Sequence, residues 1–597
     1  MDYKAVRNLA TLFFDQSDRL SSRPFLWAKK NGAFQPMTYG ETREAVRRFA
    51  RALKAIGIEK GDRVMIVAEN RPEWVIADLA IIATGAIAVP TYTTYTTDDY
   101  SHVLEDSGAK ALVTSTARLA EKILPAAEQA SDCKTIISID TLAPAADSAL
   151  AVLDWNGFLQ RGDAVEGDPV DWAATLQRDE VCSLIYTSGT GGSPKGVMLT
   201  HGSLLANCEG AHDLLCELGL DHEVFLSLLP LSHSYEHVCG LHFPISIGAE
   251  IYYAEGPEKV SQNLTEAQPT IMTAVPRLYE VLHDRIRRGV DAKGGLSAKL
   301  FHRTVALGSK AYRAPESLSL LERVENAFLD KAVRSKVAGR FGGRLKAFVS
   351  GGAALNPDIG TFFLSLGIRI LQGYGQTEAS PVVACNRCEP NKIHSVGPPL
   401  KDVEVRIAPD GEILVRGALL MKGYWGDPET TAKTIIDGWL HTGDIGQIDE
   451  DGYILITDRK KDIIVISGGD NIAPARVEGQ LTIEPEIAQV MTFGDKHPYL
   501  VAVVVPEQSF IEEWATERNV EPTLASIKDD AEFIKAIGAA VDRGNSRLTQ
   551  TEKVRRFIIA DEAFTTENAM MTPTLKLRRH LIKDAYRDRL AALYVRN

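Results

Sequence analysis

YTSGTGGSPKG, residues 186–196, is the stretch from which the whole chain can be interpreted. It follows Val181 to Tyr186 (VCSLIY), an apolar run that predicts a buried strand. Small residues let a backbone approach an anion closely, and their amides and hydroxyls supply hydrogen-bond donors. Lys195 adds a positive charge to these donors. The stretch therefore predicts a loop that binds phosphate groups.

Two common phosphate-binding motifs do not match this loop. A P-loop places Gly-Lys-Ser/Thr at the start of a helix, whereas Lys195 stands between Pro194 and Gly196. No dinucleotide-binding Gly-x-Gly-x-x-Gly opens a helix here either. We expect the next helix to begin late, with Thr200 as its N-cap and one apolar face. That face consists of Leu204, Cys208, Ala211 and Leu215.

Around the loop, short strand-like runs alternate with amphipathic stretches. This alternation predicts an α/β fold with largely parallel sheets. The stretch 39–56, with apolar residues three and four apart, predicts a helix. The expected strands are 62–69, 86–92, 110–114, 134–140, 223–229, 270–275, 345–350 and 369–372.

The pattern changes near residue 400. Residues 402–417 predict a hairpin that turns at Pro409-Asp410-Gly411, and 447–457 predict another that turns at Asp451-Gly452. A charged cluster, residues 458–462, separates these hairpins from a small α+β pattern. We predict a large N-terminal domain of layered α/β subdomains, residues 1–458, and a small mobile α+β C-terminal domain, residues 459–597.

Composition narrows the class of protein. A chain of 597 residues is too long for one hydrophobic core. Its net charge of −13 argues against broad nucleic-acid binding. Seven cysteines are too few for a disulfide scaffold and favour a reducing compartment, and a metal role for Cys385 and Cys388 is disfavoured. The N-terminus does not resemble a leader peptide. We expect a cytoplasmic protein, with peripheral contact to the inner face of a membrane left open.

The loop resembles the signature loop of the adenylate-forming (AMP-binding) superfamily, which includes the acyl-CoA synthetases. That family usually reads YTSGTTGxPKG, so Gly191 here replaces a threonine and one possible donor to ATP is lost. The resemblance implies that the loop cradles the phosphates of ATP. The implied ligands are Thr187, Ser188, Gly189, Thr190, Gly191, Gly192 and Lys195.

Further family motifs follow in chain order. The segment 350–353 resembles the one on which the adenine ring lies, which implicates Gly352 and Ala353. Residues 372–378 resemble the family segment in which the tyrosine stacks on adenine, the threonine contacts the α-phosphate and the glutamate binds Mg²⁺. The implied residues are Gln372, Gly373, Tyr374, Gly375, Thr377 and Glu378. Thr190 and Glu378 would hold the ion together.

Four residues beyond 440 complete the resemblance. Asp444, in Thr442-Gly443-Asp444, matches the aspartate that accepts hydrogen bonds from the ribose hydroxyls, and Arg459 matches the arginine that also reaches the ribose. Lys461 stands where the family has its hinge. Lys576 matches the adenylation lysine, in a Thr-Leu-Lys variant typical of long-chain acyl-CoA synthetases.

A histidine segment, residues 230–237, resembles the family segment beside the acyl pocket. His233 is expected to line the path of the carboxylate or thiol, and a zinc pair formed by His233 and His237 is disfavoured. The resemblance implies activation of a fatty acid by ATP and Mg²⁺, with Lys576, Thr190, Glu378 and His233 as catalytic residues and coenzyme A as the acceptor. A fatty-acyl-AMP ligase that loads a carrier protein remains the alternative. An inactive AMP or acyl sensor is a weaker one, and the sequence lacks the Gly-x-Ser-x-Gly of a hydrolase.

Overall fold

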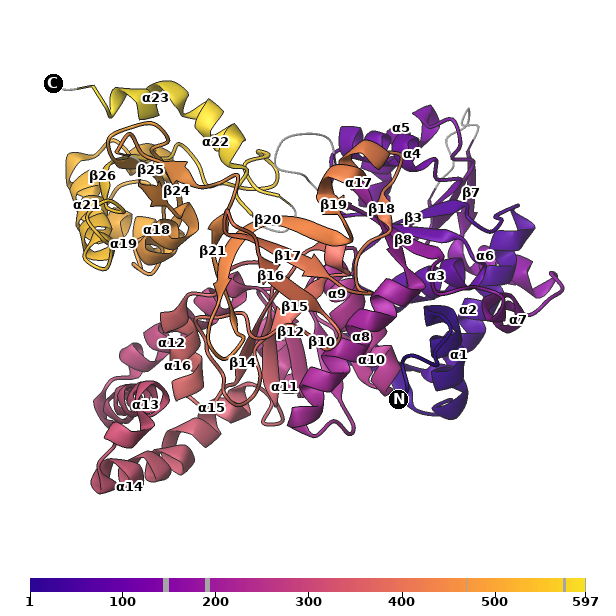
Figure 1. Cartoon of the computed structure of the whole chain (residues 1–597), viewed down its shortest axis with the longest axis horizontal. Coiled ribbons are helices and arrows are strands. Elements are labelled where there is room, and N and C mark those ends of the chain that lie inside the picture. The colour runs from indigo at the N-terminus through magenta and orange to yellow at the C-terminus, as the bar shows by residue number, and fades with distance from the viewer. Residues whose placement is uncertain (143–149, 188–193, 469, 573–575, 596–597) are drawn as a thin grey trace. The chain divides into compact units, whose positions relative to one another are not determined.

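A computed structural model describes residues 1–142, 150–187, 194–468, 470–572 and 576–595 (Figure 1). The chain divides into two compact units. The first contains Met1–Arg406, Leu414–Thr442 and Ile448–Leu455. The second contains Ile407–Ile413, Gly443–Gln447 and Ile456–Asn597. The α/β fold with a large N-terminal part is confirmed, and the exact boundary after residue 458 stays a prediction.

One large sheet of the first unit has eight strands in the order β15-β14-β13-β12-β10-β11-β1-β2. The six strands from β14 to β1 are parallel, and β15 and β2 run antiparallel at the two edges. Because parallel strands end at a common edge, their following loops meet there. The strands are β1 (Pro24–Lys30), β2 (Ala33–Thr38), β10 (Val224–Ser227), β11 (Glu250–Tyr253), β12 (Ile271–Ala274), β13 (Ala347–Ser350), β14 (Ile370–Gly375) and β15 (Val382–Cys385).

A second eight-stranded sheet has the order β18-β9-β8-β4-β3-β5-β6-β7. The strands from β8 to β7 are parallel, and β9 folds back antiparallel on β8. The predicted strands of the first 140 residues all lie in this sheet. Its members are β3 (Arg63–Val67), β4 (Ile87–Pro90), β5 (Ala111–Thr114), β6 (Thr135–Ser138), β7 (Ala151–Asp154), β8 (Val181–Thr187), β9 (Lys195–Thr200) and β18 (Gly423–Tyr424).

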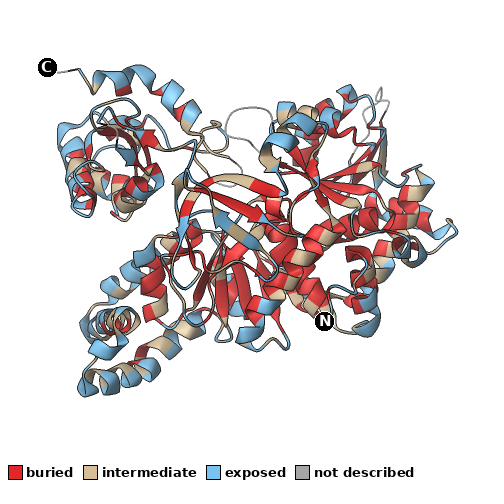
Figure 2. Cartoon of the chain, viewed as in Figure 1, coloured by how far each residue is buried: buried red, intermediate tan, exposed pale blue. Residues whose placement is uncertain are grey.

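Helices cover these sheets, and the buried residues gather in the strands and on the helix faces that cover them (Figure 2). The predicted helix 39–56 is α2, which a capping box between Thr38 and Glu41 starts. Its apolar positions three and four apart bury Val46, Phe49 and Leu53. Burying a phenylalanine side chain such as that of Phe49 contributes about 1.5–3 kcal/mol.

The predicted helix after the phosphate loop is α8, and the Thr200 side chain accepts a hydrogen bond from the Ser203 amide as its N-cap. All four residues of its predicted face are buried. The α-helices of the first unit are α1 (Leu9–Arg19), α2 (Tyr39–Ala55), α3 (Pro72–Ala83), α4 (Thr97–Ser107), α5 (Ala117–Gln129), α6 (Trp155–Asp163), α7 (Pro169–Ala174), α8 (His201–Leu215), α9 (Ser234–Glu236), α10 (Phe243–Ile247), α11 (Val260–Ala267), α12 (Pro276–Lys293), α13 (Gly295–Arg313), α14 (Leu320–Leu329), α15 (Ser335–Arg340), α16 (Pro357–Ser365) and α17 (Pro428–Thr434). Its shorter helical turns are η1 (Cys216–Leu218), η2 (His237–His242), η3 (Pro315–Ser317), η4 (Asp330–Arg334) and η5 (Thr377–Ala379).

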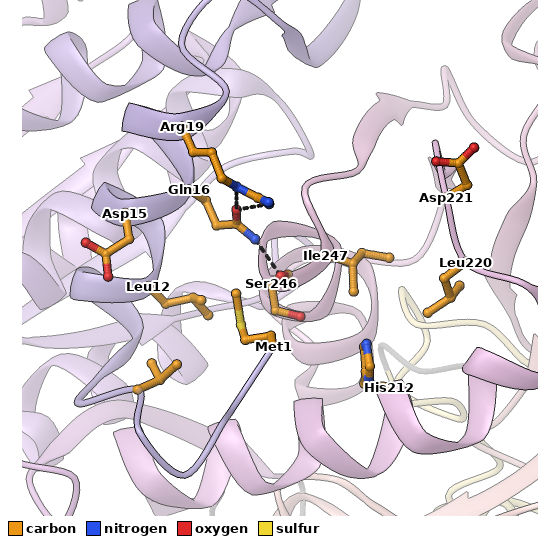
Figure 3. A pocket seen from close by; sticks show the side chains of 11 residues that line it. Met1, Leu12, Asp15, Gln16, Arg19, His212, Leu220, Asp221, Ser246 and Ile247 are labelled. Atoms are coloured by element: carbon orange, nitrogen blue, oxygen red, sulfur yellow. Dashed lines mark hydrogen bonds between the residues drawn. The ribbon is translucent and has the colours of Figure 1, made fainter.

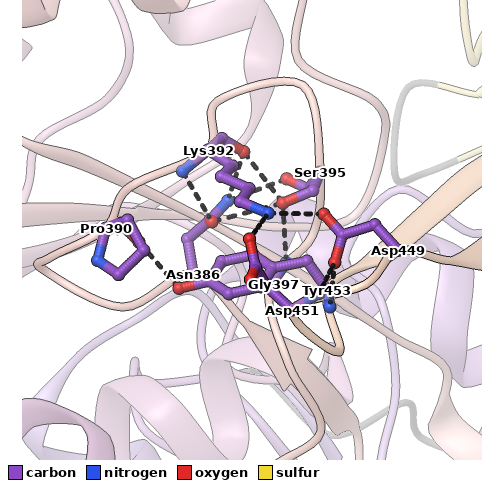
Figure 4. A network of polar contacts seen from close by, with 8 residues as sticks. All are labelled: Asn386, Pro390, Lys392, Ser395, Gly397, Asp449, Asp451 and Tyr453. Carbon is purple, nitrogen blue, oxygen red and sulfur yellow. Dashed lines mark hydrogen bonds and ion pairs between the residues drawn. The ribbon is translucent and has the colours of Figure 1, made fainter.

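Both predicted hairpin turns are present near residues 410 and 451. The Gly411 amide donates to the Ala408 carbonyl at 2.9 Å, and the Gly452 amide donates to the Asp449 carbonyl at 3.0 Å. A polar network holds the second turn, because the Lys392 ammonium pairs with Asp449 and Asp451, both at 2.6 Å (Figure 4). The strands here are β16 (Glu404–Ile407), β17 (Glu412–Arg416), β19 (Ile435–Ile436), β20 (Trp439–Ile448) and β21 (Ile454–Arg459).

The second unit is built around a three-stranded sheet with the order β24-β25-β26. Central β25 is buried at every position, because apolar clusters cover both of its faces. The strands are β22 (Ile464–Val465), β23 (Asn471–Ile472), β24 (Ile487–Phe493), β25 (Leu500–Pro506) and β26 (Val554–Ile559). The helices are α18 (Pro474–Leu481), α19 (Gln508–Arg518), α20 (Leu524–Ile527), α21 (Ala531–Asn545), α22 (Arg579–Ala585) and α23 (Arg587–Ala592).

Candidate active site

The predicted adenine-binding residues of the first unit lie at the ends of two neighbouring parallel strands: Gly352 and Ala353 follow β13, and Gln372 to Gly375 are the last residues of β14. Ser350, the last residue of β13, pairs with Gln372 in β14, so the segments after both strands start from the same sheet edge. Gly351 leaves little room for a side chain, since a Cβ there would lie 3.0 Å from the Tyr235 ring. Gly352 has φ +83°, a conformation that favours glycine. These backbone requirements explain the paired glycines.

Both polar atoms of the Gln372 side chain form hydrogen bonds to the backbone at this sheet edge. Its Oε1 accepts from the Leu355 amide at 3.2 Å, and its Nε2 donates to the Ser395 carbonyl at 3.2 Å. Asn386 donates to the same carbonyl at 2.7 Å, within the network of Figure 4. The Gln372 side chain therefore positions the strand end, and its contact with a nucleotide stays a prediction.

Thr377 connects the end of β14 to the histidine segment. Its Oγ1 lies 3.0 Å from the Ser234 Oγ, and both side chains are buried. His233 is the N-cap of α9, where its Nδ1 accepts from the Tyr235 amide at 3.1 Å. The His233 ring lies 6.5 Å from the Tyr92 ring. The structure thus brings Thr377 and the segment of His233 together, and the roles predicted for the two residues stay predictions.

Tyr424, which the sequence motifs did not indicate, contacts both Glu378 and Lys195. The Tyr424 hydroxyl donates to Glu378 Oε1 at 2.8 Å. The Lys195 ammonium lies 5.5 Å from the centre of the Tyr424 ring and donates to Thr430 Oγ1 at 3.0 Å. Burial, followed by the negative charge of Glu378, raises the pKa of Tyr424, so its hydroxyl keeps the proton that it donates.

The two strands that carry the phosphate loop are fixed by antiparallel pairing, with Thr187 opposite Lys195. The Tyr186 hydroxyl donates to Asp106 Oδ2 at 2.6 Å and anchors the start of the loop. Tyr424 belongs to β18, which pairs with β9 and so lies beside the loop's return strand. The predicted ligands Ser188, Gly189, Thr190, Gly191 and Gly192 lie outside the described residues.

Of the predicted site residues, the second unit carries Asp444, Arg459, Lys461 and Lys576. Asp444 is 4% exposed, and its Oδ1 lies 3.2 Å from the Arg459 Nε, so the two predicted ribose ligands are in contact. Lys461 lies in the turn that follows β21. The Lys576 amide donates to Thr572 Oγ1 at 3.0 Å, and its carbonyl accepts from the Thr572 amide at 2.8 Å. These two bonds tie the Lys576 backbone to Thr572.

A cavity of about 460 Å³ lies elsewhere, between α1 and the segment from His212 to Ile247 (Figure 3). Gln16 crosses it, because its Nε2 donates to the Ser246 carbonyl at 2.5 Å and its Oε1 accepts from Arg19. None of the predicted site residues that the structure describes lines this cavity. We therefore assign it no part in the site.

Comparison with known protein families identifies the family to which this chain belongs. The model of the AMP-binding enzyme family matches residues 13–425, and that of the AMP-binding enzyme C-terminal domain matches residues 461–597. The chain belongs to the AMP-binding enzyme family. Long-chain-fatty-acid–CoA ligase FadD15 of Mycobacterium tuberculosis is 33% identical over 94% of this chain and 93% of its own length. Fatty acyl-CoA synthetase A of Dictyostelium discoideum is 30% identical over 97% of this chain and 88% of its own length.

Solved structures share the fold. The adenylation domain of a carboxylate reductase from Mycobacterium chelonae matches with a TM-score of 0.78 and 22% identity, over 98% of this chain and 91% of that one. An anthranilate CoA ligase in complex with anthranoyl-AMP matches with a TM-score of 0.73 and 20% identity, over 99% of this chain and 100% of that one.

Proposed function

We propose that this enzyme activates a carboxylic acid, foremost a long-chain fatty acid, with ATP and transfers the acyl group to coenzyme A. In the first step the carboxylate oxygen attacks the α-phosphorus, which gives acyl-AMP and releases pyrophosphate. In the second step the thiol sulfur attacks the acyl carbon, AMP departs, and the thiol proton is lost. The adenylate is needed because attack of a thiol on a free carboxylate would have to expel oxide, a poor leaving group, whereas AMP leaves readily.

The contact of Glu378 with Tyr424, beside Lys195 at the end of the phosphate loop, is the observation that carries this proposal. The first step brings two anions together, so catalysis depends on positioning and on charge neutralisation. In our proposal Lys195 and the loop bind the β- and γ-phosphates, and Thr377 contacts the α-phosphate. Tyr374 stacks on adenine, supported by Gly352, Ala353, Gly373 and Gly375, and Asp444 and Arg459 hold the ribose.

A Mg²⁺ site fits Glu378. Its carboxylate is half-buried, and the Tyr424 bond orients it through one oxygen. Carboxylate and phosphate oxygens are the ligands that Mg²⁺ prefers, and the bound ion would neutralise phosphate charge. Thr190 is the second protein ligand that the resemblance implies.

For the second step we propose that the C-terminal domain moves. In this proposal residues 459–597 form the mobile domain, Lys461 is the hinge, and Lys576 withdraws after stabilising the charge that develops between carboxylate and α-phosphate. His233 lines the path by which the thiol reaches the acyl carbon.

The test is CoA-dependent release of AMP by the full chain, measured with acids from acetate to oleate. The proposal expects the highest kcat/KM with long-chain acids, in line with the names of the relatives. AMP release with a carrier protein but none with CoA would favour the alternative, a fatty-acyl-AMP ligase. Activity confined to acetate would exclude the long-chain assignment.

A surface on α14 supports the peripheral membrane contact left open above. Leu320, Leu321, Val324 and Phe328 are between 61% and 84% exposed. At 100° per residue they fall within about 100° of the helix circumference, a typical apolar stripe. Leu329 is buried, and Glu322 and Glu325 pair with Lys310 and Arg303 of α13. The stripe therefore faces away from α13.

The charge of residues 276–340, which include this stripe, indicates the kind of surface that the stripe would contact. Residues 276–340 contain fourteen Lys and Arg but only seven Asp and Glu, in a chain whose net charge is −13. Basic residues beside an apolar helix face favour an anionic lipid surface. Among the described residues, no helix is both long and apolar enough to cross a bilayer. We infer that α14 lies on the anionic face of a membrane, from which a fatty acid would be drawn.

Co-sedimentation with vesicles tests this inference. The full chain should bind vesicles that contain phosphatidylglycerol and not neutral phosphatidylcholine vesicles. Leu321→Gln with Phe328→Gln should abolish binding, whereas Val520→Gln, at a residue 46% exposed in the second unit, should leave it unchanged. Unaltered binding by the double variant, or a lipid-free dimer that this variant dissociates, would contradict the assignment.

A further inference from the structure

A second cluster of polar side chains lies buried in the first unit, apart from the residues assigned above. Asp78 lies on α3, and His237 and His242 are the first and last residues of η2. Their exposed fractions are 0%, 1% and 2%. Burying charged and polar groups is costly unless they are paired or bind a metal, so this cluster needs an explanation.

The three ligand atoms lie close enough together to share one metal ion. His237 Nε2 lies 3.2 Å from Asp78 Oδ2 and 3.2 Å from His242 Nε2, and the third separation is 3.9 Å. These separations leave a point about 2.0 Å from all three atoms, which is the usual distance from Zn²⁺ to imidazole nitrogen and carboxylate oxygen. Two histidines and a carboxylate are also a ligand set that zinc accepts.

Hydrogen bonds alone fit this arrangement poorly. An imidazole nitrogen carries either one hydrogen or one lone pair, so His237 Nε2 can serve only one of its two neighbours at 3.2 Å. Asp78 Oδ1 is buried and has no hydrogen-bond partner in the structure. The separations also exceed the roughly 2.7–2.9 Å of charge-assisted hydrogen bonds. A cation between Asp78 Oδ2, His237 Nε2 and His242 Nε2 would take a lone pair from each of these three atoms and would balance the buried carboxylate charge.

The backbone between the two histidines is specialised. Residues His237–His242 form a π-helix, a rare conformation that is frequent at functional sites. In an α-helix, residues five apart point about 140° away from each other. The wider turn of the π-helix brings the two imidazole rings to a centroid distance of 4.7 Å. The conformation therefore serves the pairing of these two side chains.

We propose that Asp78, His237 and His242 bind one Zn²⁺ ion, with a water molecule as the fourth ligand. The ion is structural, because its ligands are buried and join α3 to η2. Since η2 directly follows α9, the ion also fixes the segment whose N-cap is His233. This site does not depend on the proposed ligase activity, and metal content tests it without any substrate.

The test uses the full chain, purified without chelators and with any histidine tag removed. Elemental analysis of the first-row metals should find about one zinc per chain, retained on dialysis against buffer. Protein exchanged into Co²⁺ should show the visible absorption of a four-coordinate cobalt site. His242→Gln keeps a hydrogen-bonding group of similar reach but is a poor zinc ligand, so its zinc content should fall at least tenfold.

His201→Gln is the matched control, because His201 is another buried histidine of the first unit outside the cluster. This variant should keep its zinc. Wild-type protein without stoichiometric metal, whose melting temperature neither Zn²⁺ nor a chelator shifts, would overturn the proposal. Equal zinc in wild-type and His242→Gln would mark an adventitious ion only, with the same consequence. If His242→Gln does not fold, the wild-type stoichiometry and the cobalt spectrum decide the question.

Discussion

The Tyr424 hydroxyl donates a 2.8 Å hydrogen bond to Glu378 Oε1 across 46 residues of chain. Tyr424 lies on the strand that pairs with the return strand of the phosphate loop, and Glu378 lies in the turn after β14. Two backbone bonds run beside this contact, from Met421 to the Glu378 carbonyl and from Lys422 to the Met198 carbonyl, both at 2.9 Å. The segment 421–424 therefore couples the two large sheets where Mg²⁺ and phosphates are proposed to bind.

Tyr424→Phe should lower the rate of acyl-AMP formation about 10- to 100-fold, since a hydrogen bond to a charged group contributes about 1.5–3 kcal/mol. The variant should also need more Mg²⁺, because Glu378 loses the bond that orients it. ATP–pyrophosphate exchange over a range of Mg²⁺ concentrations measures both effects. Tyr253→Phe is the control, since the Tyr253 hydroxyl is buried without a partner in the structure. Equal exchange rates in the two variants would contradict the positioning role.

Lys576→Ala should separate the two half-reactions. Without the ammonium, charge that develops between carboxylate and α-phosphate is not neutralised, and acyl-AMP formation should fall about a hundredfold or more. Transfer from supplied acyl-AMP to CoA should persist, because Lys576 is proposed to have withdrawn by then. Lys583→Ala, on α22 of the same unit, should change neither rate. Equal loss of both half-reactions would argue against the proposed movement.

The sequence predicted those features that depend on local pattern. Apolar runs predicted the parallel strands, and Thr200 with the apolar face of the residues that follow it predicted α8. Motifs of small residues predicted the strand ends, because a side chain would be crowded at Gly351 and would clash with backbone at Gly375. In each case the sequence signal is local, even where the contact that requires it, such as that of Gly351 with Tyr235, is not.

Roles that arise from distant pairing could not be predicted. Tyr424 stands in Gly423-Tyr424-Trp425-Gly426, an ordinary turn-like stretch that carries no chemical motif. The cluster of Asp78 with His242 joins residues more than 160 positions apart, and the π-helix that aligns the histidines leaves no signal in hydrophobic periodicity. The sequence disfavoured a metal pair of His233 with His237 and did not indicate His242, whose Nε2 lies 3.2 Å from His237 Nε2 in the structure.

His201 should make stability sensitive to mild acid. Burial, aided by the positive charges of Arg178 and Lys60, lowers the pKa of His201 from 6.5 to about 3. The unfolded chain therefore binds a proton that the folded chain does not, and stability is lost as the pH falls from 6.5 towards 3. Between pH 6.5 and pH 5 the loss should be about 2 kcal/mol. Urea unfolding at several pH values, compared with His201→Gln, measures it, and parallel pH profiles of the two proteins would refute it.

Gly375→Ala should damage both the fold and the nucleotide site. A Cβ at this position would lie 1.8 Å from the Pro381 carbonyl oxygen, so the backbone of β14 or of the segment after η5 must move. Such overpacking costs about 1–3 kcal/mol or more, and the shift would also displace Tyr374. Thermal unfolding and the KM for ATP measure the two effects. Gly339→Ala on α15, where nothing lies within 4 Å of the added Cβ, should keep the wild-type KM and melt at the same or a slightly higher temperature. A Gly375→Ala protein that behaves like Gly339→Ala would mean that this strand end tolerates a side chain, and that the glycine has another purpose.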